Sequence, residues 1–429
     1  MAYEPVGVVE ARIWGRTVGA LQLEPSVNRY AFEFDPSFLR TGQDISPLRL
    51  PRIPGAQVFT DLRFETYRGL PAAFADSLPD SFGNALVNAA LTREGVREEQ
   101  ISSLDRLAYL GKRGTGALEY YPMIGPRATA STALKLSELV VAARAALEGT
   151  IQADEDTGAA LHQLIQVGTS AGGARAKAVV AWNPATQELR SGHADVPAGF
   201  EHWLLKFDVG EDGSLNDTRD YGRIEFAYHL MAIDAGLQMS DCRLLEEHGR
   251  AHFMTRRFDR VNGEKIHLQT LCAIDHLDFQ LVSTHEYGQY LQVIDRLGLG
   301  AEARAEGFRR MAFNLYMANL DDHTKNLSFT MGREGEWSLS PAYDVTHSYN
   351  SQGEWTGRHQ MGVEGKFAQI RLADLQALAE RHSVPRWKDI VDQVRGTQKR
   401  WLDYATFAGV PEDHAALIAE DMRKLEPSG

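Results

Sequence analysis

Cysteine is scarce in this chain of 429 residues, which contains only Cys242 and Cys272. The two residues have no metal-ligand spacing, so we expect buried thiols in a reducing compartment rather than a disulfide framework. The sequence has no apolar run long enough for a transmembrane helix, which needs roughly 18 residues or more. Its first residues lack a basic segment followed by an apolar one, which argues against a signal peptide. These absences together favour a cytoplasmic protein.

Basic residues are also fewer than acidic ones. The chain has 45 Lys and Arg and 58 Asp and Glu, which gives a net charge of −13. A protein that binds DNA by itself usually carries a basic footprint. The composition therefore argues against autonomous nucleic-acid binding, although it leaves room for a local basic patch. In other respects the chain is an ordinary globular one, with 43% hydrophobic and 24% charged residues. Its length allows about two to four domains with a large core.

Short alternating runs near the start of the chain predict β-strands. Apolar and polar side chains alternate in residues 9–13 and again in residues 21–24, which is typical of a meander or a small barrel. Farther along, Asp80 and Ser81 precede a helical pattern and predict its N-terminal cap. Residues 125–133 are small and polar and include a proline, so they predict a linker at a domain boundary.

The second part of the chain begins with a glycine-rich stretch and strands and ends with helices. We expect a helix over residues 223–237, because its apolar residues recur at helical spacing. Four of its side chains are expected to face inward: Phe226, Leu230, Ile233 and Leu237. Beyond about residue 277 the pattern is mainly helical, except for a hairpin near residues 326–339. This order of parts is that of a two-lobed kinase.

Three polar residues in the helical part have an informative spacing. Asn326 follows Asp321 by five residues, and Asp344 comes about a hairpin later. This is the spacing of a kinase catalytic loop and its metal-binding aspartate. A carboxylate at residue 321 can accept a hydroxyl proton, and the other two residues offer the hard oxygen ligands that suit Mg²⁺ beside a triphosphate. The pattern therefore predicts a phosphoryl-transfer site.

A lysine inside an apolar strand is the second candidate. Lys206 lies in the run Trp203–Phe207, and a buried ammonium needs a negative partner. The functional interpretation pairs Lys206 with ATP phosphates and with Glu225 on the following helix, as in protein kinases. The alternatives are an exposed edge-strand lysine and a solvent-facing glutamate. Strand alternation alone does not separate these interpretations.

Residues 168–177 form a glycine-rich stretch before a predicted strand. Small residues allow backbone N–H groups to approach phosphate oxygens closely. The stretch is not a Walker loop, because Ala174 stands where the lysine is required. It is not the kinase G-x-G-x-x-G loop either, because Ser170 replaces a glycine. Taken alone, it is as well explained by a flexible turn.

The neighbours of the catalytic candidates carry further chemistry. His323 can contact a ligand or be a satisfied core histidine, and Lys325 can neutralise the transferring phosphoryl group. Asp322 is expected to support or cap the loop, and Tyr343 to support Asp344 by packing. This charged cluster lies between apolar stretches, and several ionisable groups at a partly buried site usually indicate function.

Together these segments resemble those of the HipA family. The members of this family are bacterial serine/threonine protein kinases that act as toxins of toxin–antitoxin pairs. The resemblance covers nearly the whole chain. In the first part it is carried by residues 104–111 and 114–120. In the second part it is carried by these segments: 170–177, 204–207, 257–260, 321–326 and 340–344.

The resemblance implies an α+β fold with three parts. A small β-rich N-terminal subdomain would cover residues 1–125. A kinase N-lobe, with the glycine-rich loop and the ATP lysine, would cover residues 126–250. The hinge and a helical C-lobe with the catalytic loop would cover residues 251–429.

The resemblance also implies roles for individual residues, with ATP and Mg²⁺ as cofactors. The catalytic residue would be Asp321, Mg²⁺ would bind Asn326 and Asp344, and Lys206 with its partner Glu225 would hold the ATP phosphates. The other ATP-binding residues would be Gly172, Gly173, Ala174, Arg175, Ala176, Lys177, Arg256, Arg257, Phe258, His323, Lys325 and Tyr343.

Two further features follow from the resemblance. Residues 256–258 would form the hinge that receives adenine. Arg256 departs from the acidic residue expected there, so these contacts would use backbone groups. Ser170 would be an autophosphorylation site. Its phosphate would add close to two negative charges where the ATP phosphates bind, which favours an inactive loop.

The implied partner is a separate HipB-like helix-turn-helix antitoxin that binds operator DNA, so contact with DNA would be indirect. The implied substrate class is the aminoacyl-tRNA synthetases, such as glutamyl-tRNA synthetase, whose phosphorylation inhibits translation. Two alternatives remain. One is a kinase fold kept as a catalytically weak regulator or corepressor, and the other is a small-molecule kinase on the same scaffold.

Overall fold

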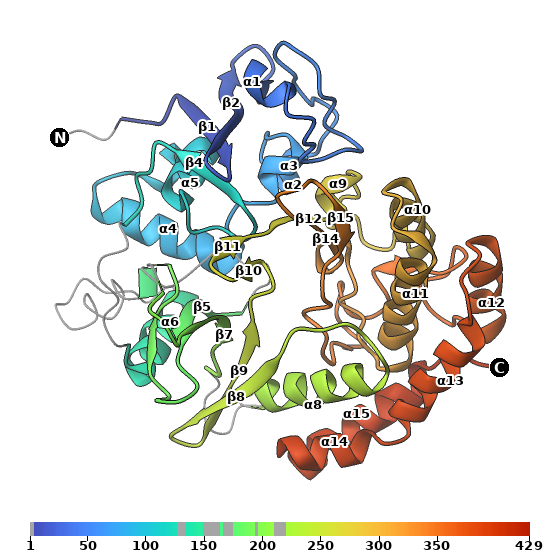
Figure 1. Ribbon diagram of the computed structural model, residues 1–429. Helices are drawn as coiled ribbons and strands as arrows, with labels where there is room; N and C mark the ends of the chain where they lie inside the picture. The colour runs from blue at the N-terminus through green and yellow to red at the C-terminus, as the bar shows by residue number, and fades with distance from the viewer. Residues whose placement is uncertain (1–3, 127–133, 149–163, 166–174, 194–195, 210–219) are drawn as a thin grey trace.

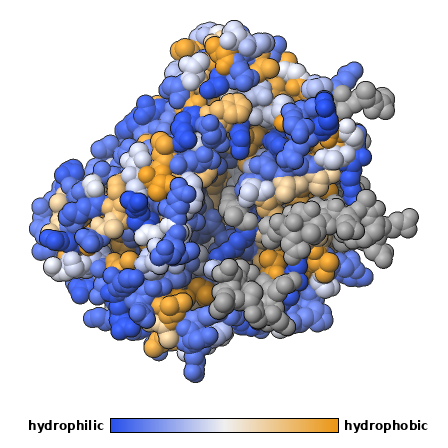
Figure 2. All heavy atoms as spheres, turned by 180° about the vertical axis from the view of Figure 1, so that it is seen from behind, coloured by the Kyte–Doolittle hydropathy of each residue, from blue (hydrophilic) through white to orange (hydrophobic). Residues whose placement is uncertain are grey.

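The computed structural model describes residues 4–126, 134–148, 164–165, 175–193, 196–209 and 220–429. It is a mixed α/β protein (Figure 1) in which an N-terminal unit, a second β-sheet with helices and a helical C-terminal part follow one another along the chain. Both cysteines are buried free thiols. None of the described helices combines the length and the apolar character that crossing a bilayer requires. The face opposite to that of Figure 1 is mainly hydrophilic, with small separate apolar patches (Figure 2).

The N-terminal unit is built on an antiparallel sheet of four strands in the order β3-β2-β1-β4. The strands are β1 (Val8–Ile13), β2 (Arg16–Glu24), β3 (Arg29–Phe34) and β4 (Leu118–Tyr121). The helical segments are α1 (Pro36–Leu39), α2 (Phe64–Tyr67), α3 (Ala72–Ala75), α4 (Ser81–Arg93), η1 (Glu98–Gln100) and α5 (Ser103–Leu110). Val9, Ala11 and Ile13 are all fully buried. The strands predicted from the alternating pattern are confirmed.

Helix α4 begins where the sequence predicts. Asp80 is its N-cap, and the carboxylate Oδ1 accepts a hydrogen bond of 2.7 Å from the N–H of Gly83. The buried face of α4, which includes Phe82 and Leu86, belongs to the same hydrophobic cluster as α6 (Leu136–Glu148) and the second sheet. The N-terminal unit therefore shares a core with the part of the chain that follows it.

The second sheet has five antiparallel strands in the order β6-β5-β7-β9-β8. Its strands are β5 (Lys177–Trp182), β6 (Leu189–Ser191), β7 (Glu201–Lys206), β8 (Cys242–Glu247) and β9 (Arg250–Arg256). We call this sheet with α6 and α8 (Tyr221–Asp234) the N-lobe. The boundary expected between residues 250 and 251 falls inside β9, which pairs with β7 and β8. We therefore propose that the N-lobe extends to Arg256.

Helix α8 buries a different face from the one that the sequence pattern predicts. Ile233 is 47% exposed, so the prediction that it faces inward is wrong. Leu237 is buried, but it lies beyond the end of the helix. The fully buried Tyr228 and the buried Glu225 take the inner positions instead. The reason is that α8 packs against β8 and β9 on one side and against α14 (Trp401–Ala408) on another, so no single apolar stripe describes its burial.

The C-lobe is the helical remainder of the chain, drawn in yellow to red in Figure 1. Its helices, besides α14, are α9 (Leu271–Ile274), α10 (Tyr287–Arg296), α11 (Gly300–Tyr316), η2 (Thr324–Asn326), α12 (Leu372–Arg381), α13 (Trp387–Gln398) and α15 (Glu412–Leu425). Its strands are β10 (Arg260–Val261), β11 (Glu264–Lys265), β12 (His267–Thr270), β13 (His285–Glu286), β14 (Ser328–Met331), β15 (Trp337–Leu339) and β16 (Met361–Gly362). The hairpin β14–β15 confirms the one predicted from sequence.

A buried charge network fastens the N-terminal unit to the segment between the lobes. Asp259 is 3% exposed and accepts hydrogen bonds from Arg257 at 2.7 Å and from Arg260 at 2.8 Å. It also accepts the N–H of Gly116, at 2.8 Å, from the N-terminal unit. Both arginines donate to the carbonyl of Gly114. Burial alone would raise the pKa of Asp259, but the two guanidinium groups hold it well below its usual range.

We expect Asp259→Asn to destabilise the protein by about 3 kcal/mol, because removing one partner leaves buried charges uncompensated. Urea denaturation at neutral pH measures this loss. Folding lowers the pKa of Asp259, so its carboxylate stabilises the folded protein at neutral pH. This stabilisation is lost only in strongly acid solution, where the carboxylate is protonated.

The matched control for this variant is Asp295→Asn, which breaks a surface ion pair with Arg304. It should cost about 0.5 kcal/mol or less. Equal losses in the two variants would contradict a structural role for the Asp259 network.

Candidate active site

The centre of the candidate site is Lys206, the last residue of β7. Its ammonium lies 2.5 Å from Oε1 of Glu225 on α8 and also donates to Oδ1 of Asp344 in the C-lobe. Lys206 is therefore the partnered, nearly buried lysine of the functional interpretation, with a side chain only 11% exposed. Burial would lower its pKa, but the two carboxylates raise the pKa above its ordinary value. One ammonium thus connects the two lobes through charge.

Asp344 follows β15 and has a backbone φ of 50°, in the left-handed region. Aspartate tolerates this region better than most residues, and such conformations cluster at functional sites. Burial would raise the pKa of Asp344, but Lys206 and Lys177 lower it, so the carboxylate is charged. The hairpin β14–β15 brings Asp344 back beside the loop that contains Asp321.

Asp321 lies in the loop between α11 and η2 and remains accessible, with a side chain 46% exposed. Its backbone N–H donates to Oγ of Ser348 at 2.9 Å, and its carbonyl accepts from Nδ2 of Asn326 at 2.8 Å. Partial burial raises the pKa of the Asp321 carboxyl, while His323 opposes this increase. The result is an accessible carboxylate on a hydrogen-bonded loop, which can take a proton from an incoming hydroxyl.

Asp322 faces the opposite way and anchors the loop. Its side chain is fully buried and accepts from the hydroxyl of Tyr287 at 2.7 Å and the N–H of Gln360 at 2.7 Å. Nδ1 of His359 lies 2.9 Å from the same carboxylate. The sequence suggested a supporting role for Asp322. These partners could not be found from sequence, because they lie 35 to 38 residues away along the chain.

The other predicted residues of this segment surround Asp321 and Asp344. Nε2 of His323 lies 3.7 Å from Oδ1 of Asp321, and its ring packs edge-on against Phe279. The ammonium of Lys325 lies 4.7 Å from the centre of the same Phe279 ring. The hydroxyl of Tyr343 donates to the carbonyl of Lys325 at 2.6 Å. The tyrosine thereby fixes the segment of Asp344 to the loop that contains Asp321.

The glycine-rich stretch is described only from Arg175 onward. Four of its predicted residues lie outside the described residues: Ser170, Gly172, Gly173 and Ala174. Arg175 lies 3.6 Å from Oε2 of Glu225 and stacks over Tyr221. Ala176 is fully buried and its carbonyl accepts the N–H of Phe207.

Lys177 is 1% exposed and forms an ion pair of 2.6 Å with Asp80 of the N-terminal unit. Sequence reasoning identified Asp80 only as a helix cap. The ion pair joins residues 97 positions apart, and no local pattern signals such a partner.

The three predicted hinge residues have different surroundings. The guanidinium of Arg256 is half exposed and lies 3.6 Å from Glu201 and 3.5 Å from Asp241. The guanidinium of Arg257 is engaged in the buried network around Asp259, while its N–H donates to the carbonyl of His202. Of the three, only Phe258 has a side chain in ring contact with the segment of Asp344, at 6.0 Å from Tyr343 between ring centres. Any contact of Arg257 with adenine would use its backbone carbonyl, because its N–H is already bonded to His202.

The donor set suits Mg²⁺ beside phosphate. Asn326 donates its amide N–H to the Asp321 carbonyl, which leaves the amide oxygen as its ligand atom. Asp344 adds a charged carboxylate. A cavity of about 20 Å³ is lined in part by these two residues, but it is also lined by Arg310 and by neither Lys206 nor Asp321, so it does not locate the metal. In the described residues there is no cluster of three or more acidic, histidine or cysteine side chains that could hold a metal alone. Mg²⁺ needs no such cluster, because it is usually held by one or two carboxylates with phosphate oxygens and water.

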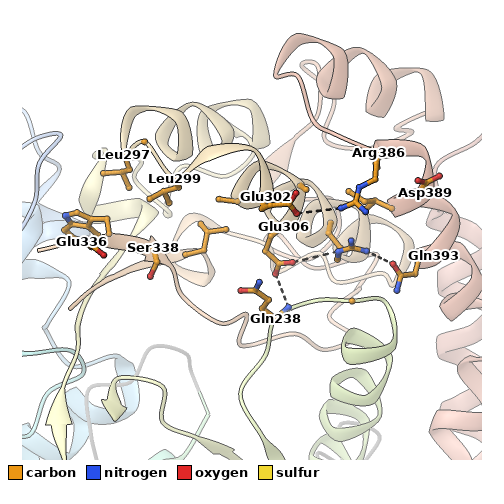
Figure 3. A pocket seen from close by; sticks show the side chains of 18 of the residues that line it. Gln238, Leu297, Leu299, Glu302, Glu306, Glu336, Ser338, Arg386, Asp389 and Gln393 are labelled. Atoms are coloured by element: carbon orange, nitrogen blue, oxygen red, sulfur yellow. Dashed lines mark hydrogen bonds and ion pairs between the residues drawn. The ribbon is translucent and has the colours of Figure 1, made fainter. Parts of the chain in front are cut away.

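A larger groove, of about 880 Å³, lies elsewhere on the C-lobe (Figure 3). Glu306 at its floor accepts the N–H of Gln238 at 3.1 Å and the guanidinium of Arg310 at 2.9 Å. Glu302 and Arg386 face each other at 3.7 Å on its rim. None of the predicted site residues lines this groove. Size alone therefore does not locate the candidate active site.

Comparisons with known proteins agree with the fold described above. A family model described as the HipA-like C-terminal domain matches residues 169–423, and one described as the HipA N-terminal domain matches residues 9–121. Y4dM of Sinorhizobium fredii (strain NBRC 101917 / NGR234), which is named as a candidate kinase, is 29% identical over 217 residues. That match covers 46% of this chain and 50% of Y4dM, so the chain spans half the length of this curated relative.

One solved structure shows the same fold. HipA in the Shewanella oneidensis MR-1 complex of HipA, HipB and operator DNA matches with a TM-score of 0.65 at 17% sequence identity. The match covers 97% of this chain and 95% of that one. The proinflammatory kinase CtkA of Helicobacter pylori covers 52% of this chain at 11% identity, with a TM-score of 0.35 that supports no conclusion. Because the HipA-like C-terminal domain model spans more than half of the sequence, this chain belongs to the HipA family.

Proposed function

We propose that this chain is an ATP- and Mg²⁺-dependent serine/threonine protein kinase that acts as the toxin of a type II toxin–antitoxin pair. One observation carries the proposal. The Lys206 ammonium contacts both Glu225 on the N-lobe helix and Asp344 on the C-lobe. Protein kinases need both the lysine–glutamate pair and the metal-binding aspartate in place for phosphoryl transfer.

In the proposed reaction, a substrate hydroxyl oxygen forms a bond to the γ-phosphorus of ATP while the bond to ADP breaks. Asp321 takes the hydroxyl proton, and its exposed carboxylate suits that role. When bound, Mg²⁺ would supply positive charge that offsets the negative charge of the phosphate oxygens. Asn326 and Asp344 would hold it, and Lys206 would orient the phosphates.

We propose that the rest of the nucleotide site comes from the glycine-rich stretch, the segment between the lobes and the neighbours of Asp321 and Asp344. Residues 172–177 would form the phosphate loop, and the backbone of residues 256–258 would receive adenine. His323, Lys325 and Tyr343 would border the phosphates. Phosphorylation of Ser170 would place negative charge where those phosphates bind and switch the site off.

The proposed partner is a HipB-like antitoxin with a helix-turn-helix fold. The Shewanella oneidensis HipA structure contains HipB and operator DNA, which supports a partner of this kind. The net charge of −13 agrees with contact to DNA through the partner rather than directly. The proposed substrate is an aminoacyl-tRNA synthetase, such as glutamyl-tRNA synthetase, whose inactivation would stop translation.

We expect Asp321→Ala and Asp344→Ala each to reduce phosphate incorporation from labelled ATP by at least about 100-fold, because they remove the proton acceptor and the metal ligand. The control is Glu302→Gln, which changes a carboxylate 85% exposed on the groove of Figure 3 and should leave the rate unchanged. Incorporation by the wild type no greater than by Asp321→Ala would exclude the kinase and leave a binding protein. Label that enters a small molecule and no protein band would indicate a small-molecule kinase.

We expect brief expression of the wild type to add phosphoserine or phosphothreonine to an aminoacyl-tRNA synthetase in the host. Phosphoproteomics against cells expressing Asp344→Ala measures this difference and names the target. New phosphosites confined to proteins outside the synthetases would refute the proposed substrate class while leaving the kinase activity intact.

A further inference from the structure

Lys177 and Lys206 form a pair of like charges at the ends of two neighbouring strands of the N-lobe sheet. They are direct partners in the antiparallel register of β5 and β7, so their side chains leave the same face of the sheet. Lys206 is balanced by Glu225 and Asp344, as described above. Lys177 is balanced by Asp80, at 2.6 Å, from the N-terminal unit. A buried ammonium of this kind requires such a partner, because leaving it without one is costly.

The position of Asp80 is fixed by the helix that it begins. Its Oδ1 caps α4 through the N–H of Gly83, and its Oδ2 holds the Lys177 ammonium. Phe82 and Leu86 of α4 are buried in the cluster that also contains the N-lobe sheet residues Ala178 and Leu205. The carboxylate is thus attached to a packed helix rather than to a movable loop.

A second acidic residue of the N-terminal unit lies nearby. Asp76 accepts the N–H and the hydroxyl of Thr270, each at 2.7 Å, at the start of α9. Burial raises the pKa of both Asp76 and Asp80, and Lys325 of the catalytic segment is close enough to oppose both increases. Residues 76–80 therefore contribute two carboxylates, and Asp80 is the one that forms an ion pair with a lysine of the N-lobe.

We propose that Asp80 is a positioning residue of this site, which fixes the Lys177 ammonium beside Lys206 so that both bind the nucleotide phosphates. The N-terminal unit would thereby complete the nucleotide site of the two lobes. The inference rests on the proposed kinase function for its ligand, and it adds a residue from outside the two lobes. It explains why the capping aspartate of α4 is buried against a lysine of the N-lobe, which capping alone does not require.

The test is Asp80→Asn in the full chain. Asparagine is as good an N-cap as aspartate, so the substitution preserves the cap and removes the charge. We expect an affinity for a non-hydrolysable ATP analogue with Mg²⁺ about tenfold weaker, because Lys177 loses the ion pair with Asp80 that helps to fix its position. Calorimetry measures the affinity, and thermal unfolding of the free protein measures stability. Asp80→Glu, which keeps the charge, should recover most of the affinity.

The matched control is Asp35→Asn. Asp35 is also an N-cap aspartate of the N-terminal unit, with its side chain accepting the N–H of Ser37 at 2.7 Å, and it forms no ion pair with any described residue. This variant should bind the analogue as the wild type does. Lys177→Met should weaken binding as Asp80→Asn does, and the double variant Asp80→Asn with Lys177→Met should be no weaker than Lys177→Met alone. If Asp80→Asn fails to fold, the affinities of Lys177→Met and Asp80→Glu still test the inference.

An Asp80→Asn protein with lower stability and unchanged affinity would overturn the inference, because the ion pair would then serve the fold alone. Unchanged affinity in Lys177→Met would overturn it as well. The proposed function is tested separately by phosphate transfer from labelled ATP. A wild type that binds the analogue but transfers no phosphate would refute the kinase, and weaker binding by Asp80→Asn would still support the positioning role.

Discussion

The rest of the site depends on the contact of one ammonium with two carboxylates from different parts of the chain. Lys206 ends a strand of the N-lobe, Glu225 lies on α8, and Asp344 follows a hairpin of the C-lobe. Each of these charges is buried or nearly so, and each would be costly alone. These charges compensate one another only when the two lobes hold a fixed position relative to each other. The same requirement places Asp321 and Asn326 beside Asp344, since the hairpin β14–β15 and the hydroxyl of Tyr343 join their segments.

Compensated buried charges also hold the N-terminal unit against the two lobes. Its contacts with the remainder are made by buried ionic groups as well as by apolar packing: Asp259 binds the backbone of Gly116, and Asp80 binds Lys177. A buried charge tolerates few arrangements, because each polar group must find a partner in a fixed direction. Such contacts hold the N-terminal unit in one orientation relative to the candidate nucleotide site.

Sequence reasoning performed well where chemistry depends on local spacing. The spacing of Asp321, Asn326 and Asp344 predicted a single site, and the structure brings all three together. The strands of residues 9–13 and the cap at Asp80 were also predictable, because alternation and capping are local properties. The inner face of α8 was not predictable in the same way. Helix α8 packs on two sides, so the apolar stripe that usually marks a buried face does not mark it here.

The sequence by itself determined the reactive groups, their order along the chain and the family resemblance that the comparisons confirm. It left open whether Lys206 is exposed or partnered and whether Glu225 faces solvent, and the tertiary structure decided both in favour of the ion pair. Only the tertiary structure connected Lys177 with Asp80, and Asp322 with Tyr287 and His359. The physical reason is that an ion pair is recognised by the distance between charges in space. Local sequence patterns carry information about neighbours along one helix or strand, and these partners meet only after separate elements have packed.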